Sequence, residues 1–445
     1  MAVAEFVAAI FNGNPPFRIE AYDGSVAGAP DAPLTVRFLR KEALTRALTR
    51  PGELGISRAY VAGDVELDGD LTVLFDLQVP PVSTLLKTGP LKALLKETGV
   101  SILKPIAPPS IEARQKGLLH SKARDSAAIS HHYDVSNDFY RIILGPSMVY
   151  SCAVFDSPED SLEDAQIRKV DLIARKLDLA PGMRLLDVGC GWGTMAIHAA
   201  KVYGCSAVGV TLSEPQQRRA TERAEEAGVG DLVEFRVQDF RDVTDGPFDA
   251  ISSIGMFEHV GRRSMELYIR TLYQLLKPGG RFLNHAIGRP ATRDAEPNPT
   301  RLHELTRQIS IAAGLRGPSR VHSPFIERYV FPDGELHEVG TLVSMFQAFG
   351  FEVRHLEGLR EHYALTLHQW VRNLEEDWDT ACAQVGEERA RVWRLYMAGS
   401  AAGFEKHELE IHQVLCVRPE HGSAQMPLRP MFEPVTVDRW VNSLV

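Results

Sequence analysis

Three glycines two residues apart follow an apolar stretch near the middle of the chain. Residues 185–193 read Leu-Leu-Asp-Val-Gly-Cys-Gly-Trp-Gly, and residues 194–203 are typical of a helix. Glycine has no Cβ, so such a loop passes close to a ligand, and the first N–H groups of the helix point toward it. The G-x-G-x-G spacing differs from the G-x-G-x-x-G of dinucleotide sites, which favours a smaller nucleotide-like cofactor such as S-adenosylmethionine. A tight strand-to-helix turn without a ligand is the alternative.

Apolar strands and helical stretches alternate around this loop. The expected strands are 184–188, 207–212, 233–237, 248–254 and 281–287, with helices near 194–203, 214–228 and 264–276. Two later strands, 351–357 and 408–417, and a helix at 335–349 complete a seven-stranded methyltransferase-type sheet. This order predicts an α/β fold with a doubly wound, Rossmann-like sheet. Ligands of such sheets bind at the carboxyl ends of the strands, where Gly189, Thr211, Asp239 and Glu258 are expected to meet.

The length of 445 residues predicts more than one domain. We expect a small N-terminal α+β accessory domain at 1–105, associated with lipid or membrane, with short strands at 17–22, 34–38 and 64–67. A proline-rich linker at 106–125 then leads to a second domain at 126–420, which contains the sheet, and a C-terminal tail at 421–445. The segments 289–334 and 360–406 are too long for turns and are expected to form a helical cap over the sheet's carboxyl edge.

Composition and charge exclude several functions. The net charge of −9 gives no general attraction to nucleic acid, so no nucleic-acid partner is expected. The five cysteines are odd in number and scattered, which argues against a disulfide framework or a zinc site, and no metal is expected. The N-terminus lacks a basic segment, and no apolar run reaches membrane-spanning length. We therefore expect a cytoplasmic protein.

Further motifs occur in a fixed order around the glycine loop. They lie at 131–140, 145–155, 255–261, 285–288, 331–334 and 360–367, the last reading Arg-Glu-His-Tyr-Ala-Leu-Thr-Leu. From about residue 120 to 418 the chain therefore resembles the cyclopropane-fatty-acid synthase family of S-adenosylmethionine-dependent fatty-acyl methyltransferases, which includes actinobacterial 10-methylene and 10-methyl fatty acid synthases. The segments 59–63 and 66–71 resemble the domain that precedes the catalytic one in longer bacterial members.

The resemblance implies a substrate and a reaction. The expected reaction is methyl transfer to the C=C bond of an unsaturated, oleoyl-type acyl chain of a membrane phospholipid. Two rival functions stay open, a small-molecule S-adenosylmethionine methyltransferase and an S-adenosylmethionine-binding protein without turnover.

The resemblance also implies which residues hold S-adenosylmethionine. The expected set is Tyr133, Tyr150 and Ser151 near the methionine end, Asp187, Gly189 and Gly191 in the loop, Thr211, Leu212 and Gln216 at the ribose and adenine, and Asp239 at adenine. The acid often found at the end of the second strand is absent, since Thr211 and Leu212 stand there. Gln216 is the favoured ribose partner, and Glu214 is the alternative.

Alkene methylation leaves a carbocation, so the site must be dry and must hold a base. In the family this base is a bicarbonate or carbonate ion, and the resemblance implies as its ligands Cys152, Glu258, His285, the backbone of Ile287, and Tyr363. The O–H of bicarbonate would donate to Glu258, which gives this carboxylate an orienting role. Each residue also has a structural interpretation, Cys152 as a buried thiol, Glu258 as a helix cap and His285 as a core histidine.

The product stays open at this point. Many family members have an aromatic residue where this chain has Val154, next to the reacting centre. Loss of a proton from the added methyl group gives a cyclopropane, whereas a hydride shift before proton loss gives a methylene branch. A methylene product would imply a reductase partner, and a homo-oligomer is a further open alternative. Tyr329 lines the acyl channel or simply packs.

A cluster of lysines spans the end of the N-terminal domain and the linker. The six are Lys87, Lys92, Lys96, Lys104, Lys116 and Lys122. With Leu91, Leu94 and Leu95 at helical spacing, this segment is either a basic amphipathic helix on an anionic bilayer or a solvated helix face. We expect peripheral association with the inner face of the plasma membrane.

Overall fold

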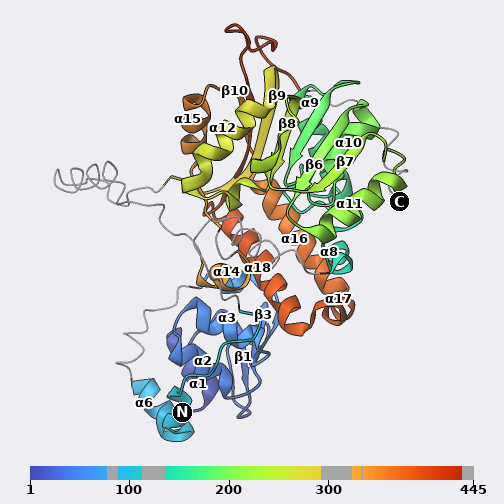
Figure 1. Ribbon diagram of the computed structural model, residues 1–445. Coiled ribbons are helices and arrows are strands. Elements are labelled where there is room, and N and C mark those ends of the chain that lie inside the picture. Colours follow the sequence, from blue (N-terminus) through green and yellow to red (C-terminus); the bar gives the residue numbers. More distant parts are fainter. Residues whose placement is uncertain (78–88, 113–135, 292–322, 332–333, 433–445) are drawn as a thin grey trace, which may run out of the picture. The chain divides into compact units, whose positions relative to one another are not determined.

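The computed structural model describes residues 1–77, 89–112, 136–291, 323–331 and 334–432 (Figure 1). The chain forms two compact units. The first combines residues 1–114, 322–332 and 374–402, and the second combines 115–321, 333–373 and 403–445. None of the described helices is both long and apolar enough to cross a membrane.

The second unit is built on a seven-stranded sheet in the order β10-β11-β9-β8-β5-β6-β7. The strands are β5 (Arg184–Val188), β6 (Ser206–Thr211), β7 (Val233–Val237), β8 (Phe248–Ile254), β9 (Leu276–Gly288), β10 (Glu352–Gly358) and β11 (Glu410–Val417). Each neighbouring pair in the series β9-β8-β5-β6-β7 is parallel. Strand β11 runs antiparallel to both of its neighbours, β9 and β10. The expected Rossmann-like sheet is confirmed.

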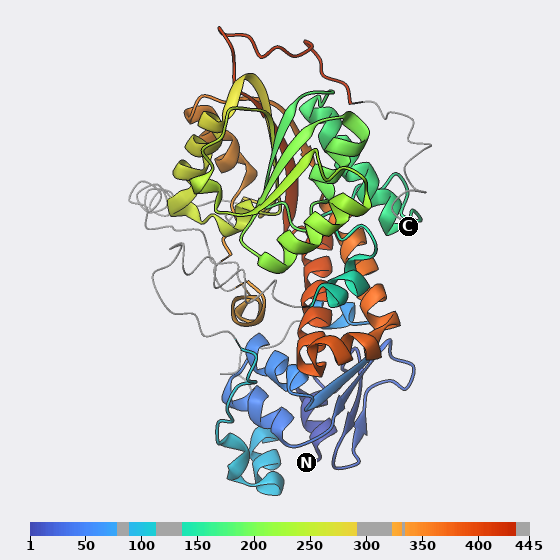
Figure 2. The ribbon, with the colours of Figure 1, turned by 45° about the vertical axis from the view of Figure 1, so that its right-hand side comes forward.

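Helices cover both faces of this sheet (Figures 1 and 2). On one face lie α9 (Leu162–Leu177), α10 (Thr194–Tyr203) and α11 (Glu214–Glu226), and on the other lie α12 (Met265–Leu275) and α15 (Val339–Ala348). Along β5, Leu185 packs with the first group of helices and Leu186 with the second, because successive strand side chains point to opposite faces. The sheet is therefore buried on both sides, and its carboxyl edge is left for ligands.

Local sequence accounts for the ends of the helices that reach this edge. Ser161 and Ser213 cap α9 and α11 by accepting from the backbone N–H groups of Asp164 and Gln216. Gly193 begins α10 with φ of +82°, in the left-handed region that glycine adopts without strain. The Gly193 turn and the Ser213 cap fix the connections that follow β5 and β6.

The first unit contains a four-stranded sheet in the order β2-β1-β3-β4. Its strands are β1 (Arg18–Ala21), β2 (Val26–Ala27), β3 (Leu34–Phe38) and β4 (Val65–Gly69), and its N-terminal helices are α1 (Val3–Ile10), α2 (Glu42–Thr49), α3 (Glu53–Val61), α4 (Thr72–Phe75) and α6 (Gly89–Thr98). This is an α+β arrangement with strands close to the expected positions. Leu91 and Leu94 of α6 are buried. The apolar side of α6 therefore packs within its unit, while Lys92 and Lys96 are exposed.

Two segments expected in the cap belong instead to this first unit. They contain α14 (Pro324–Tyr329), α17 (Trp378–Val385) and most of α18 (Glu387–Glu405). Arg391 donates to the carbonyl of Val65 and to Glu66, at 3.1 and 2.6 Å. Tyr329 donates to Glu112, which also pairs with Arg58. The proposed linker at 106–125 is thus folded against this unit as far as Glu112, and 374–402 extends the unit rather than the cap.

Candidate functional site

A pocket opens at the carboxyl edge of the seven-stranded sheet, around the glycine loop. It is lined by nine residues of the predicted cofactor set: Tyr150, Ser151, Asp187, Gly189, Gly191, Thr211, Leu212, Gln216 and Asp239. They come from the segment before α9 and from the ends of β5, β6 and β7. Tyr133 lies outside the described residues.

The three glycines of the loop have different tasks. Each has a positive φ, at +76°, +54° and +82° for Gly189, Gly191 and Gly193. A Cβ on Gly193 would lie 2.4 Å from Cζ of Phe235, so this glycine lets α10 pack against the sheet. A Cβ on Gly191 would have no atom within 4 Å and would project into open space. Gly191 therefore keeps room for a ligand rather than for the protein.

Arg223 of α11 holds two walls of the pocket together. Its guanidinium donates to the carbonyl of Trp192 at 2.7 Å, to Oγ1 of Thr194 at 2.9 Å and to the carbonyl of Ser147 at 3.0 Å. Oγ1 of Thr194 also donates to the Ser147 carbonyl. The glycine loop and the segment that carries Tyr150 are thereby fixed relative to each other.

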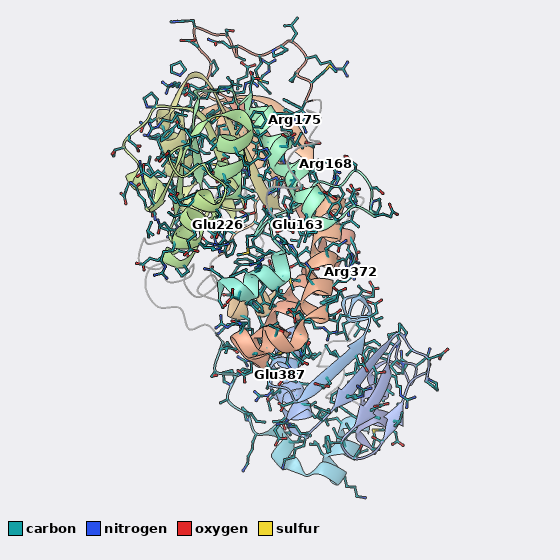
Figure 3. The ribbon with its side chains drawn as sticks, turned by 90° about the vertical axis from the view of Figure 1, so that its right-hand side faces the viewer. Glu163, Arg168, Arg175, Glu226, Arg372 and Glu387 are labelled. Carbon is teal, nitrogen blue, oxygen red and sulfur yellow. The ribbon has the colours of Figure 1, made fainter. Side chains whose placement is uncertain are left out.

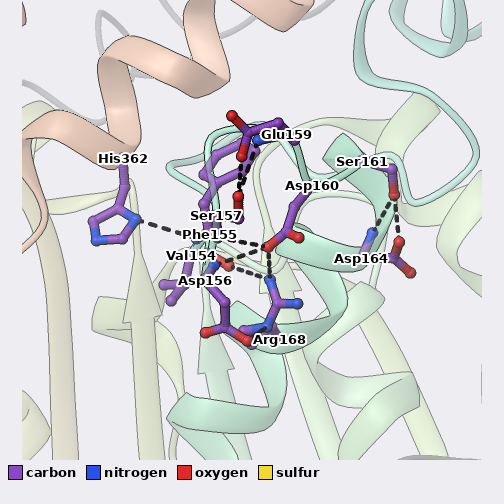
Figure 4. Close-up of polar contacts among 10 residues, drawn as sticks. All are labelled: Val154, Phe155, Asp156, Ser157, Glu159, Asp160, Ser161, Asp164, Arg168 and His362. Carbon is purple, nitrogen blue, oxygen red and sulfur yellow. Dashed lines mark hydrogen bonds and ion pairs between the residues drawn. The ribbon is translucent and has the colours of Figure 1, made fainter.

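The segment from Cys152 to Phe155 is tied to the start of α16 (Arg360–Glu376). The Ala153 N–H donates to Oγ1 of Thr366 at 3.0 Å, and the Phe155 N–H donates to Nδ1 of His362 at 3.1 Å (Figure 4). On the other side Arg168 donates to the Val154 carbonyl and to Asp160, both at 3.0 Å. These bonds place Cys152 and α16 at one end of the sheet.

Glu258 and His285 form a second polar group at the ends of β8 and β9. Oε1 of Glu258 accepts from the Ile287 N–H at 2.6 Å, whereas Oε2 is buried without a partner among the described residues. Neither ring nitrogen of His285 has a partner there, and the ring is wholly buried. Burial raises the pKa of Glu258 to about 7 and lowers that of His285 well below its usual value. The imidazole is therefore neutral, with one donor and one acceptor available.

Cys152 and Tyr363 lie in the same unit as this group. Sγ of Cys152 donates to the carbonyls of Ala153 and Leu359, at 3.2 and 3.7 Å, and burial raises the pKa of the thiol far above its usual value. The carbonyl of Leu359 also accepts from the Tyr363 N–H, which links Cys152 to the first turn of α16. The Tyr363 side chain is buried, with its ring 4.7 Å from that of Phe404 and 6.0 Å from that of Trp370.

A row of aromatic rings runs from the glycine loop to α16. Successive ring centroids are 4.6 Å apart for Trp192 and Tyr140, 5.9 Å for Tyr140 and Tyr150, and 5.3 Å for Tyr150 and Trp370. Nε1 of Trp370 is buried without a partner among the described residues. Aromatic faces attract cations, so this row suits a positively charged ligand or intermediate.

Sequence reasoning missed three polar residues of the site. Oγ of Ser252 donates to Asp187 at 2.7 Å, Thr366 supports the backbone next to Cys152, and Lys169 lines the cofactor pocket. Lys169 occupies a position on the buried stripe of α9, and a lysine on such a stripe is the signal that could have revealed it. Burial raises the pKa of Asp187 to about 6 and lowers that of Lys169 to about 8.

Comparisons with known proteins find relatives over most of the chain. A family model described as mycolic acid cyclopropane synthetase matches residues 120–414. A probable fatty acid methyltransferase of Mycobacterium tuberculosis is 43% identical over 440 residues, which are 95% of this chain and 96% of the relative. The cyclopropane-fatty-acyl-phospholipid synthase of Escherichia coli is 32% identical over 387 residues, covering 87% and 88%.

A solved structure resembles about two thirds of the chain. The crystal structure of mycolic acid cyclopropane synthase CmaA1, complexed with SAH and CTAB, has 33% sequence identity and a TM-score of 0.56. The match covers 65% of this chain and 97% of that chain.

Two alanine substitutions in the glycine loop should separate ligand binding from packing. Gly191→Ala should weaken the binding of S-adenosylhomocysteine at least about tenfold, because the new Cβ enters the ligand's space. It should also lower the free energy of unfolding by about 1–2 kcal/mol, because alanine is strained at this positive φ. Gly193→Ala should cost more stability through its clash with Phe235. Calorimetric affinities and unfolding midpoints measure both. Unchanged affinity in Gly191→Ala would contradict the placement of the ligand.

The raised pKa of Glu258 makes stability depend on pH. The folded protein holds this proton more tightly than the unfolded chain, whose value is 4.5, so stability is lost as pH rises from 4.5 through 7. Relative to Glu258→Gln, the wild type should lose about 3 kcal/mol of unfolding free energy across this range. Urea unfolding at pH 5 and pH 8 in bicarbonate-free buffer gives the difference. An equal difference at both pH values would mean that the carboxyl group is solvated.

Proposed function

The chain belongs to the mycolic acid cyclopropane synthetase family, and we propose that it transfers a methyl group from S-adenosylmethionine to the C=C bond of an unsaturated acyl chain carried on a phospholipid. The observation that carries this proposal is that one unit holds both a cofactor pocket and buried polar atoms without partners among the described residues, namely Oε2 of Glu258 and the ring nitrogens of His285. A methyltransferase acting on oxygen or nitrogen has a nucleophile with its own lone pair. An alkene has none, so it needs a water-free site and a separate proton acceptor.

The protein's own residues exclude water and stabilise positive charge. When bound in the pocket, S-adenosylmethionine supplies an electrophilic methyl group, and the methylated alkene is a carbocation that must lose a proton. Cys152 and His285 are wholly buried, so water does not compete for the cation. Tyr150 and Trp370 offer aromatic faces within the same row of rings. The chain thus favours proton loss over hydration.

Bicarbonate fits the unpartnered atoms of this group. The neutral imidazole of His285 and Oε2 of Glu258 are buried and lack partners among the described residues, which supports an anion with both donor and acceptor oxygens. Bound there, bicarbonate would supply the base. Glu258 would accept its O–H, while the Ile287 N–H keeps the carboxylate oriented through Oε1. Cys152 and Tyr363 would complete the walls.

Two products are consistent with this chemistry. Proton loss from the added methyl group closes a cyclopropane, and proton loss after a hydride shift gives a methylene branch, which a reductase partner would convert to a methyl branch. Val154 contributes no aromatic ring, but its N–H donates to the Ala165 carbonyl and its carbonyl accepts from Arg168. Its backbone therefore fixes the segment that follows Cys152, whatever the product.

Lipid analysis of expressing cells tests the proposal. Cells fed oleate and expressing the wild type should accumulate acyl chains heavier by one CH₂, and fragmentation identifies a cyclopropane or a methylene branch. Glu258→Gln should keep S-adenosylhomocysteine affinity within about twofold and lose at least about 100-fold in turnover. The change disturbs only the orientation of bicarbonate, the proposed proton acceptor, and leaves the cofactor pocket intact.

Gly191→Ala serves as the matched control, because it should lose cofactor affinity as well as turnover. Near-normal turnover in Glu258→Gln would make this residue structural. Wild-type cells without a modified lipid would overturn the proposed reaction.

We also propose peripheral contact with an anionic membrane at the inner face of the plasma membrane. Since Leu91 and Leu94 are buried, this contact would use the charge of Lys92 and Lys96 rather than an inserted apolar face. Lys87, Lys116 and Lys122 lie outside the described residues.

Vesicle flotation separates the effect of these two lysines from that of the overall charge of the protein. Lys92→Glu/Lys96→Glu should bind anionic vesicles several-fold more weakly than the wild type at low salt, with little difference at high salt. A control with Lys41→Glu/Arg263→Glu, at exposed positions elsewhere, should bind like the wild type. Equal binding by both variants and the wild type would remove this contact.

A further inference from the structure

Helix α9 carries four basic residues, and one of them has no carboxylate within ion-pair distance in the described part of the chain. Three are ion-paired: Arg168 with Asp156 and Asp160, Arg175 with Asp171, and Lys176 with Glu357. Figure 3 labels Arg168 and Arg175 on this helix. The fourth, Lys169, has no carboxylate within 4.0 Å among the described residues.

Lys169 is nevertheless as buried as Lys176, which is ion-paired. Its residue is 1% exposed, and the hydrogen bond it makes among the described residues is from Nζ to Oγ of Ser151, at 2.8 Å. An ammonium group has three donors, so two are left over. Asp187 attracts this ammonium group electrostatically but is not within ion-pair distance among the described residues. A buried charge without a close partner is costly, and an incoming carboxylate would offset that cost. Lys176, two turns along the same face, shows the completed arrangement with Glu357 and Gln413.

Lys169 is one of the residues that line the cofactor pocket. Lys169, Ser151, Asp187 and Gly189 all line it. Asp187 accepts from Ser252 and is not within ion-pair distance of Lys169 among the described contacts. The pocket wall therefore presents a separate cation and a separate carboxyl group. A ligand that fits both carries a carboxylate and an ammonium on one carbon, which is the amino-acid end of S-adenosylmethionine.

We propose that Lys169 binds the methionine carboxylate of S-adenosylmethionine together with Ser151, while Asp187 faces the α-ammonium group. This inference rests on the proposed use of S-adenosylmethionine. Binding there places the sulfonium centre near Tyr150, which precedes Ser151 in the chain and lines the same pocket. Lys169 is thus a binding residue that also orients the methyl donor.

Ligands that differ only at the amino-acid end test this assignment. Three are compared by calorimetry: S-adenosylhomocysteine, its decarboxylated analogue S-adenosyl-3-thiopropylamine, and 5′-methylthioadenosine, which lacks the whole amino-acid end. The wild type should bind S-adenosylhomocysteine about 10- to 100-fold more tightly than the decarboxylated analogue. Lys169→Met should lose that preference and keep its affinity for 5′-methylthioadenosine within about twofold.

Lys176→Met is the matched control, since it removes a buried lysine from the same helix outside the pocket. It should lower stability and preserve the wild-type preference among the three ligands. Equal wild-type affinity for the first two ligands would overturn the assignment even if Lys169→Met failed to fold. Equal weakening of the affinity for all three ligands in Lys169→Met would also overturn the assignment. So would a Lys169→Met protein that loses turnover but keeps all three affinities, because the Lys169 ammonium would then belong to the anion site. A wild type that binds S-adenosylhomocysteine but modifies no lipid would overturn the proposed reaction and leave this assignment standing.

Discussion

Desolvation of polar groups at one edge of a sheet is the constraint on which this structure depends. Glu258, His285 and Lys169 are taken out of water, and within the described ranges they have fewer partners than they have donors and acceptors. Each unsatisfied group costs about 1–3 kcal/mol, and more when it is charged. The apolar layers on both faces of the seven-stranded sheet hold these groups in place. A site of this kind is completed by its ligands, which gives their binding a strong driving force.

The elements that position the site were largely readable from the sequence. The strands 184–188, 233–237 and 248–254 have the expected bounds. The first and third are buried apolar runs, and the edge strand 233–237 alternates around the buried Phe235. The pocket also collects the predicted residues from separate strand ends. The bounds of β9 were underestimated, since its first residues, Leu276 to Gly280, contain a proline and two glycines that resemble a turn.

Other features depend on contacts that no local pattern reveals. The spacing of Leu91 and Leu94 correctly indicates a helix with one buried face, but it does not say whether protein or lipid covers that face. Likewise, 374–402 reads as part of an insert, and its membership of the first unit comes from Arg391 reaching Glu66, far away in the sequence. Lys169 looks like an ordinary residue of a charged helix until its neighbours are known. Long-range partners of charged side chains were the information that the sequence lacked.

The burial of Cys152 has a consequence for redox chemistry. Oxidants and alkylating agents attack the thiolate, and a wholly buried thiol with a strongly raised pKa offers almost none of it. Of the five cysteines, Cys382 is the one that is only partly buried. Peroxide stress should therefore modify Cys382 first and spare Cys152 at the proposed reaction centre, so that the lipid-modifying activity outlasts oxidation elsewhere on the chain.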